Sequence, residues 1–253
     1  MTKLRLLDLF SGIGGFSLGL ERSGAFETVA FCEIDPFCRR VLKKHWPEVP
    51  CYDDVRTISA ERLTADGVWP NAIAGGFPCQ DISFAGRGAG LEGERSGLFF
   101  EYDRLIGDVR PSLVLMENVS ALLHRGGLAV LSALAARGYD AWWETIPAKA
   151  IGLPHERDRV WLLAYSDEIG REACKRIQAV VLGEAVPWTS WQPMELCGTR
   201  SGGTRWIPNS VVCVVDNGVS ANLGGLGAAG NAVVPQIPEL IGRAIKQSME
   251  RAA

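Results

Sequence analysis

Histidines and closely spaced cysteines, the usual ligands of protein-bound zinc, are scarce in this sequence. Its 253 residues include three isolated histidines and seven scattered cysteines, none of them in a C-x-x-C pair. An odd number of scattered cysteines disfavours a disulfide framework or a zinc cluster and is typical of a reducing compartment. We therefore expect no metal site.

Long apolar runs are missing as well. No stretch approaches the length that a membrane-spanning helix needs, and residues 1–5 lack the apolar core of a signal peptide. Hydrophobic residues still make up 47% of the chain, enough for one α/β domain with a small appendage. These features predict a soluble, cytoplasmic protein that does not bind a membrane.

The chain also lacks an excess of basic charge. Its 26 Lys and Arg residues are outnumbered by 29 Asp and Glu residues, which gives a formal net charge of −3. A protein that coats nucleic acid non-specifically has a strong positive field, so this class is disfavoured. Any contact with nucleic acid has to be local, as in the cleft of an enzyme.

One cysteine stands out by its surroundings. The apolar run 72–74 ends at two glycines and continues as Phe77-Pro78-Cys79-Gln80. This pattern predicts a buried strand that presents Cys79 at the carboxyl edge of a sheet, where α/β proteins bind ligands. The alternative is an ordinary buried thiol at a strand end. Five glycines in residues 82–97 favour a loop, which we interpret as a lid.

A nucleotide-type corner is predicted near the start of the chain. Residues 4–9 form a near-continuous apolar run, typical of a parallel strand covered on both faces. The glycines that follow, Gly12 and Gly14 among them, let the backbone approach a ligand at the start of a helix. A second strand, 28–33, ends in Glu33, 21 positions after Gly12, the spacing at which a carboxylate binds a ribose diol.

The corner departs from the dinucleotide-binding pattern because Ser17 stands where the third glycine is expected. A ligand with a ribose but no pyrophosphate therefore suits it better. Asp54, farther along, is a candidate to accept a hydrogen bond from an adenine amino group. A solvated acid in a turn is the alternative for this residue.

Three further residues are candidates for chemistry. Glu117 follows the predicted strand 113–116, where a carboxylate needs a partner or a proton. It is a candidate acid, and a strand-end Glu capped by loop amides is the alternative. Arg157 and Arg159 are two apart in an expected extended segment and share one face, so they could bind anions or a base carbonyl. A solvated mixed-charge turn is the alternative.

The remaining segments are predicted to form strands, helices and loops without a catalytic role. Paired strands are expected over 139–148 and 160–165, and residues from 166 to about 205 read as an irregular insertion without charge bias. Helices are expected over residues 36–45, 60–65, 98–109, 128–137 and 237–249.

Taken in order, several motifs resemble those of the C5-cytosine DNA methyltransferases. They are Asp8–Phe16, Gly75–Gln80, Glu117–Val119, the pair Arg157 and Arg159, and Gly230–Val233. The resemblance implies the S-adenosylmethionine-dependent methyltransferase fold, an α/β class with a Rossmann-like, mostly parallel sheet flanked by helices. It implies a catalytic domain of residues 1–165 and 226–253, with a small irregular target-recognition region over 166–225.

The resemblance also implies a role for each matched residue. Cys79 would be the nucleophile, Glu117 the partner of the cytosine ring nitrogen, and Arg159 a donor to the base carbonyl, with Arg157 supporting the thiolate. The residues implied to bind S-adenosylmethionine are Gly12, Gly14, Phe16, Glu33, Asp54, Pro78, Leu98, Asn231 and Val233. The substrate would be duplex DNA, methylated by a monomer of prokaryotic or phage origin in a restriction-modification setting.

Some positions depart from the family pattern. His155 and Glu156 replace the Gln and Arg that usually begin the arginine motif, and Glu156 adds negative charge near the expected DNA. Three alternative functions are compatible with the sequence: methylation of transfer RNA, non-catalytic binding of DNA, and nicotinamide-dependent oxidoreduction. Phe77 before Pro78, in place of a second proline, favours DNA over transfer RNA. The target sequence and any partner restriction enzyme are not encoded in a readable motif.

Overall fold

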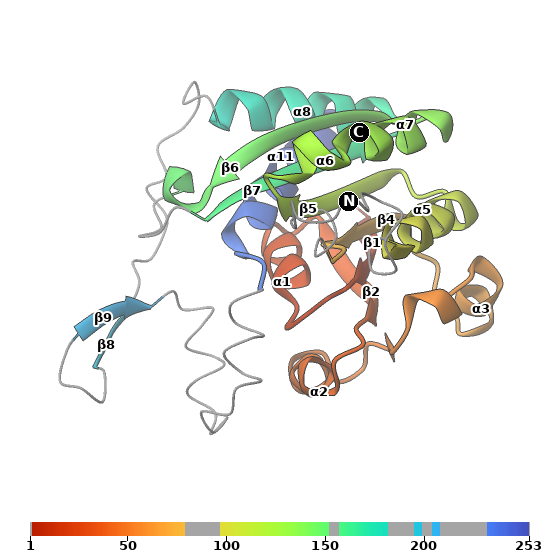
Figure 1. Ribbon diagram of the computed structural model, residues 1–253, viewed down its shortest axis with the longest axis horizontal. Helices are drawn as coiled ribbons and strands as arrows, with labels where there is room; N and C mark the ends of the chain where they lie inside the picture. The colour runs from red at the N-terminus through yellow and green to blue at the C-terminus, as the bar shows by residue number, and fades with distance from the viewer. Residues whose placement is uncertain are drawn as a thin grey trace.

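The computed structural model describes residues 2–78, 97–151, 157–181, 195–198, 204–207 and 232–252. Its centre is a seven-stranded sheet with the strand order β3-β2-β1-β4-β5-β7-β6 (Figure 1). The strands are β1 Leu4–Leu9, β2 Phe26–Cys32, β3 Cys51–Tyr52, β4 Ala72–Gly75, β5 Leu113–Val119, β6 Asp140–Pro147 and β7 Asp158–Tyr165. The first five run parallel, whereas β7 is antiparallel to both β5 and β6.

Helices cover both faces of this sheet, as the apolar runs of the central strands require. They are α1 Gly15–Arg22, α2 Pro36–His45, α3 Ala60–Ala65, α5 Gly97–Val109, α6 Leu122–Arg125, α7 Gly127–Ala136, α8 Glu168–Val181 and α11 Gln236–Ala252. Two short 3-10 helices are η1 Val55–Thr57 and η3 Ala148–Ile151. Strands β8 Glu195–Gly198 and β9 Thr204–Ile207 form a separate antiparallel pair.

The core has two layers because successive strand residues point to opposite faces. Val114 and Met116 of β5 pack with side chains of α5 and α7 on one face. Leu113 and Leu115 of the same strand pack on the other face with side chains of α1, α8 and α11. The predicted fold class, a mostly parallel α/β sheet flanked by helices, is confirmed.

The chain reverses its direction of travel across the sheet between β1 and β4. From β1 it moves outward to β2 and β3, then returns to β4 on the other side of β1. In open α/β sheets the ligand site lies at the carboxyl ends of the strands at such a switch point. A functional site is therefore expected at this edge of the sheet.

One structural prediction was wrong. Residues 168–181 were expected to be irregular, but they form α8, which buries Ala173, Cys174 and Ile177 in the core. The pattern was missed because the buried stripe is narrow and made partly of small residues, between many charged ones. The helix thus belongs to the packed body, not to an irregular insertion. The proposed division at residue 166 otherwise stays a prediction.

The last helix is joined closely to the first. A Cβ on Gly19 of α1 would clash with the carbonyl oxygen of Pro235, and one on Gly15 would clash with Val233. Glycine at both positions lets the backbone of α1 approach the segment that leads into α11. The carboxyl-terminal segment therefore returns to the corner formed by β1 and α1.

Candidate active site

Glu117 lies at the carboxyl end of β5, beside the segment that leads to Cys79. A Cβ on Gly76 would lie 3.1 Å from Oε2 of Glu117, so the backbone after β4 passes close to this carboxyl group. Phe77 and Pro78 follow, while Cys79 itself lies outside the described residues. Two segments that the sequence predicted to reach one edge are thus brought together there.

Asn118 fastens the same two segments to each other. Its side chain is 3% exposed, and its Nδ2 donates to the carbonyl oxygen of Phe77 at 3.1 Å. Its Oδ1 accepts from the backbone N–H of Val119 at 2.9 Å. Sequence reasoning assigned no role to Asn118. A buried amide directly after a candidate acid is the signal that could have found it, since buried polar groups need partners.

Arg159 is the ion-pair partner of Glu117. In the antiparallel register Arg159 pairs with Val119, so it lies diagonal to Glu117 on the same sheet face. Its Nε is 3.0 Å from Oε1 of Glu117, whose side chain is only 12% exposed. Burial raises the pKa of Glu117 above its usual value, although Arg159 and Arg157 act to lower it. The carboxyl group therefore holds a proton more readily than an exposed Glu.

Arg157 also lies near the carboxyl group of Glu117, and its backbone conformation is unusual. It has a positive φ of 29°, so the expected extended conformation is wrong at this residue. Its Nη2 donates to the carbonyl oxygen of Ala232 at 2.9 Å, which ties the start of β7 to the segment before α11. Burial and the neighbouring Arg159 lower the pKa of Arg157. Asn231, the residue before Ala232, lies outside the described residues.

The predicted nucleotide corner is formed by the ends of β1 and β2. The backbone N–H of Gly12 donates to Oε2 of Glu33 at 2.7 Å, and that of Asp35 donates to Oε1 at 2.8 Å. Gly12 has a φ of 54°, and a Cβ there would meet open space. Glu33 and Gly12, paired by their spacing in the sequence, are therefore in direct contact beside an open stretch of backbone.

Phe16 and Phe10 occupy different surroundings. Phe16 is 2% exposed and packs edge-to-face on Trp161 with ring centroids 5.5 Å apart, within the core. Phe10, which sequence reasoning did not single out, directly follows β1 with a φ of 53°. Its ring is half-buried and stacks on Tyr102. Strained backbone of this kind gathers at functional sites, so Phe10 is a further aromatic candidate for the cofactor site.

The other predicted cofactor residues lie around this corner. Gly14 has a φ of 89°, and its Cα faces the ring of Trp46 so closely that a side chain would clash. Leu98, in the first turn of α5, packs against the same core layer as Phe10. Val233 contacts Gly15 at the start of α1.

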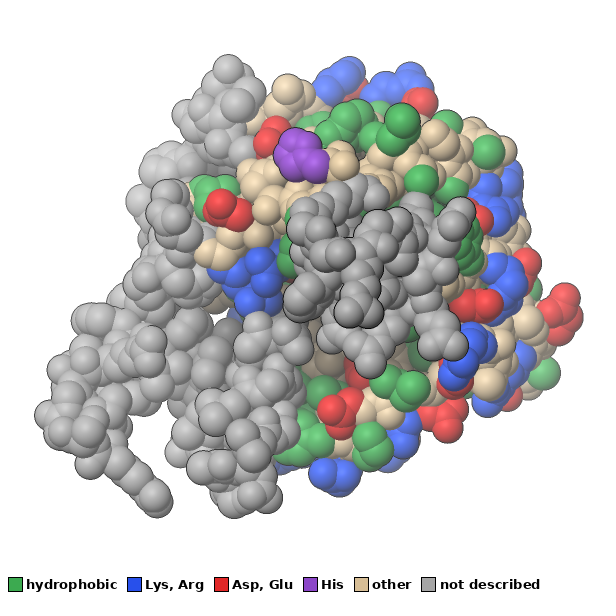
Figure 2. Space-filling view, in the orientation of Figure 1, with side chains coloured by type: hydrophobic (Ala, Val, Ile, Leu, Met, Phe, Trp, Pro, Cys, Tyr) green, Lys and Arg blue, Asp and Glu red, His purple; other side chains and the backbone are tan. Residues whose placement is uncertain are grey.

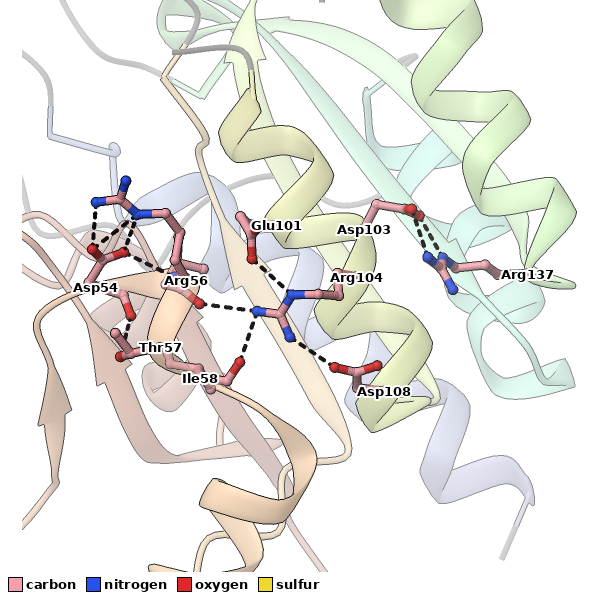
Figure 3. A network of polar contacts seen from close by, with 10 residues as sticks. Asp54, Arg56, Thr57, Ile58, Glu101, Asp103, Arg104, Asp108 and Arg137 are labelled. Atoms are coloured by element: carbon pink, nitrogen blue, oxygen red, sulfur yellow. Dashed lines mark hydrogen bonds and ion pairs between the residues drawn. The ribbon is translucent and has the colours of Figure 1, made fainter. Parts of the chain in front are cut away.

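Asp54 is engaged by a neighbouring arginine. Its carboxylate caps η1 by accepting from the backbone N–H of Arg56 at 3.0 Å, and it also receives the guanidinium fork of Arg56 (Figure 3). Arg56 lowers the pKa of Asp54, chiefly through this side-chain hydrogen bond. Asp54 follows β3, whose Tyr52 carbonyl oxygen accepts from the backbone N–H of Glu33 at 2.9 Å. The two acids thus stand at the ends of neighbouring strands.

These residues fit S-adenosylmethionine, the cofactor that the resemblance implies. Carboxylates at the ends of β2 and β3 can accept hydrogen bonds from ribose hydroxyls and an adenine amino group. The open backbone at Gly12 allows close approach, and Ile34, which follows Glu33, exposes 69% of its surface as an apolar face. A nucleoside without phosphates matches this set of groups.

No group of metal-ligating side chains is found in the described ranges. None of the described helices combines the length and apolar character that a membrane crossing requires. On the face shown in Figure 2, Lys and Arg side chains alternate with Asp and Glu side chains over the described surface.

Comparison with known proteins gives consistent matches. The family model of the C-5 cytosine-specific DNA methylases matches residues 4–181. The chain is 41% identical over 169 residues to the Type II methyltransferase M2.BsuMI of Bacillus subtilis, covering 64% of this chain and 42% of that protein. It is 31% identical over 233 residues to M.CviJI of Paramecium bursaria Chlorella virus IL3A, covering 91% of this chain and 56% of that protein. The chain thus spans about half the length of the curated relatives it matches.

Solved structures share the fold at low sequence identity. The Entamoeba histolytica methyltransferase EhMeth superposes with a TM-score of 0.70 at 14% identity, covering 98% of this chain and 99% of that one. The S. pombe Dnmt2 methyltransferase gives a TM-score of 0.59 at 16% identity, covering 98% of each chain.

Proposed function

The chain belongs to the C-5 cytosine-specific DNA methylase family, and on this premise we propose that it transfers a methyl group from S-adenosylmethionine to carbon 5 of cytosine in duplex DNA. The observation that carries the proposal is the position of Glu117. Its buried carboxyl group, with a raised pKa, lies beside the backbone that leads to Cys79. A nucleophile and a protonatable acid at one sheet edge suit chemistry on a pyrimidine.

The proposed reaction begins with the thiolate of Cys79. Carbon 5 of cytosine is too weak a nucleophile to take a methyl group unaided. The thiolate adds to carbon 6, and the displaced electron pair makes carbon 5 enamine-like while Glu117 protonates ring nitrogen 3. Glu117 suits this role because burial favours its protonated form. Arg159, already bound to Glu117, is assigned as donor to the base carbonyl.

The reaction ends with the release of the thiolate. S-adenosylmethionine, when bound, supplies an electrophilic methyl group for carbon 5. A base then removes the proton from carbon 5, the bond from sulfur to carbon 6 breaks, and the double bond between carbons 5 and 6 returns. Ring nitrogen 3 gives its proton back to Glu117, which restores the acid. The stacked duplex hides these atoms, so we propose that the cytosine is flipped out of the helix. Arg157 is assigned to support the thiolate of Cys79, since a nearby positive charge lowers the pKa of a thiol.

The cofactor is proposed to lie in the corner between β1 and β2. Glu33 would accept from the ribose hydroxyls and Asp54 from the adenine amino group, with Ile34 against a face of the base. Phe16 is kept as a predicted cofactor residue, and we add Phe10, whose half-buried ring follows β1, as a second aromatic candidate. Pro78, Leu98, Asn231 and Val233 are kept as lining residues. The part proposed to read the DNA is the predicted recognition region without α8, residues 182–225.

The test is covalent trapping. Duplex DNA in which cytosines are replaced by 5-fluorocytosine is incubated with protein and S-adenosylmethionine, because fluorine blocks the final proton removal. We expect a denaturant-resistant complex with wild-type protein and none with Cys79→Ser. Trapping of transfer RNA instead of DNA would favour the alternative substrate. No adduct on any fluorinated duplex, with cofactor bound, would contradict the proposal.

A further inference from the structure

The ion pair between Arg56 and Asp54 has a geometry that orients the carboxylate. Nε of Arg56 is 3.0 Å from Oδ1 and 3.1 Å from Oδ2, and Nη2 is 2.6 Å from Oδ2. The backbone N–H of the same residue adds a bond to Oδ1. Four bonds from one residue fix the plane of the carboxylate.

The 3-10 turn η1, which Asp54 caps, is hydrogen-bonded to Arg104 of α5. Nη2 of Arg104 donates to the carbonyl oxygens of Ile58 at 2.8 Å and Val55 at 3.3 Å (Figure 3). Arg104 is itself held by Glu101 at 2.8 Å and Asp108 at 2.9 Å. The backbone of the turn that follows Asp54 and the side chain of Asp54 are therefore both constrained before any ligand binds.

The contact with the Arg56 guanidinium also favours the ionised form of Asp54. Because Arg56 stabilises the negative charge, the carboxylate is acceptor-only. An acceptor-only group attracts the 6-amino group of adenine, which donates. It repels the 6-oxo group of hypoxanthine, which accepts. The side chain of Asp54 remains 25% exposed, so a surface for such a contact is left.

We propose that Arg56 is a positioning residue that makes Asp54 select an adenine nucleoside against its 6-oxo counterpart. The inference rests on the proposed use of S-adenosylmethionine, and it goes beyond that use by naming the specificity determinant. Arg56 acts through Asp54 and is not assigned a contact with the cofactor.

The test measures binding, not activity. Calorimetric dissociation constants are obtained for S-adenosylhomocysteine and for its deaminated form, S-inosylhomocysteine, with the whole chain. We expect Arg56→Ala to lower the preference for the adenine form about tenfold, mainly by weakening S-adenosylhomocysteine. Arg56→Lys keeps the charge but loses the fork, so it should restore part of the preference. Arg171→Ala, which removes exposed ion pairs on α8, is the matched control and should change nothing.

A second variant separates this inference from the proposed function. Asp54→Asn can turn its amide to donate to a 6-oxo group, so it should abolish most of the preference. If Asp54→Asn alters the preference and Arg56→Ala does not, the role of Arg56 is wrong while the cofactor contact stands. An unchanged preference in Asp54→Asn overturns the contact itself. Tighter binding of S-adenosylhomocysteine by Arg56→Ala would show that Arg56 blocks the site, and would overturn the inference.

Discussion

At the scale of single residues, the two candidate acids Glu117 and Asp54 lie in different surroundings. Glu117 is buried and its pKa is raised despite an arginine at 3.0 Å, so desolvation outweighs the ion pair. Asp54 lies nearer the surface, and its pKa is lowered by Arg56. These surroundings suit Glu117 to the proposed proton transfer and Asp54 to the proposed acceptance of a hydrogen bond.

Replacing Glu117 tests the first assignment. Glu117→Gln keeps the shape of the side chain but has no proton to transfer, so we expect the methylation rate to fall by about 10²- to 10⁴-fold. Binding of S-adenosylhomocysteine should stay within about twofold, because Glu117 is not assigned to the cofactor. A single-turnover assay with labelled cofactor measures the rate. A variant that keeps the wild-type rate would remove Glu117 from the mechanism.

Asp8 is a third acid, and its pKa is raised. It is fully buried on the α1 side of β1, where its Oδ2 accepts from the backbone N–H of Ser17 at 3.2 Å and from Oγ of Ser17 at 2.7 Å. Burial raises its pKa from 3.8 to about 8. Between these values the folded protein holds a proton that the unfolded chain has released.

The free energy of unfolding should therefore depend on pH at Asp8. The stability that its protonated form contributes is complete below pH 3.8 and is lost as pH rises through about 8. Relative to Asp8→Asn, wild-type stability should fall by up to about 1.4 kcal/mol per pH unit across this window. Urea unfolding of both proteins between pH 5 and 8 measures the difference. A constant difference would show that Asp8 is ionised in the folded protein.

At the scale of elements, strongly signalled helices and strands were predictable from local sequence. Asp35 and Pro36 mark the start of α2, and the structure confirms its predicted range of 36–45. Helix α8 was missed, because Ala173 and Cys174 become a buried face only when α11 packs on them. The contact of Gly12 with Glu33 could be anticipated from spacing. The fork from Arg56 to Asp54 could not, since it depends on side-chain rotamers within the turn.

The close packing of α1 against the segment before α11 predicts that a larger residue at position 19 destabilises the fold. Gly19→Ala puts a methyl group into the carbonyl oxygen of Pro235, so the two segments must separate. We expect a destabilisation of about 1–3 kcal/mol, the usual cost of overpacking. Gly97→Ala is the control, since a Cβ there meets nothing within 4 Å, and it should be neutral or slightly stabilising. Thermal unfolding of both variants decides; equal melting temperatures would argue against the close contact.

At the scale of the whole molecule, topology collects the site at one edge of the sheet. Strands β1, β2, β4 and β5 end there, and the antiparallel β7 begins there, which brings Arg159 to Glu117. Arg157 then links this edge to the segment before α11. The net charge of −3 adds no general attraction to DNA, so the proposed DNA binding would have to come from local contacts, at this edge and in the proposed recognition region.

The proposed activity, methylation of cytosine that depends on Cys79, can be measured in cells. The direct measurement is bisulfite sequencing of DNA from cells that express the chain, beside cells that express Cys79→Ser. We expect 5-methylcytosine at a short recurring sequence with the wild-type protein and none with the variant. Methylation that survives the loss of the thiol, or unmodified cytosine in both cultures despite folded, cofactor-binding protein, would contradict it.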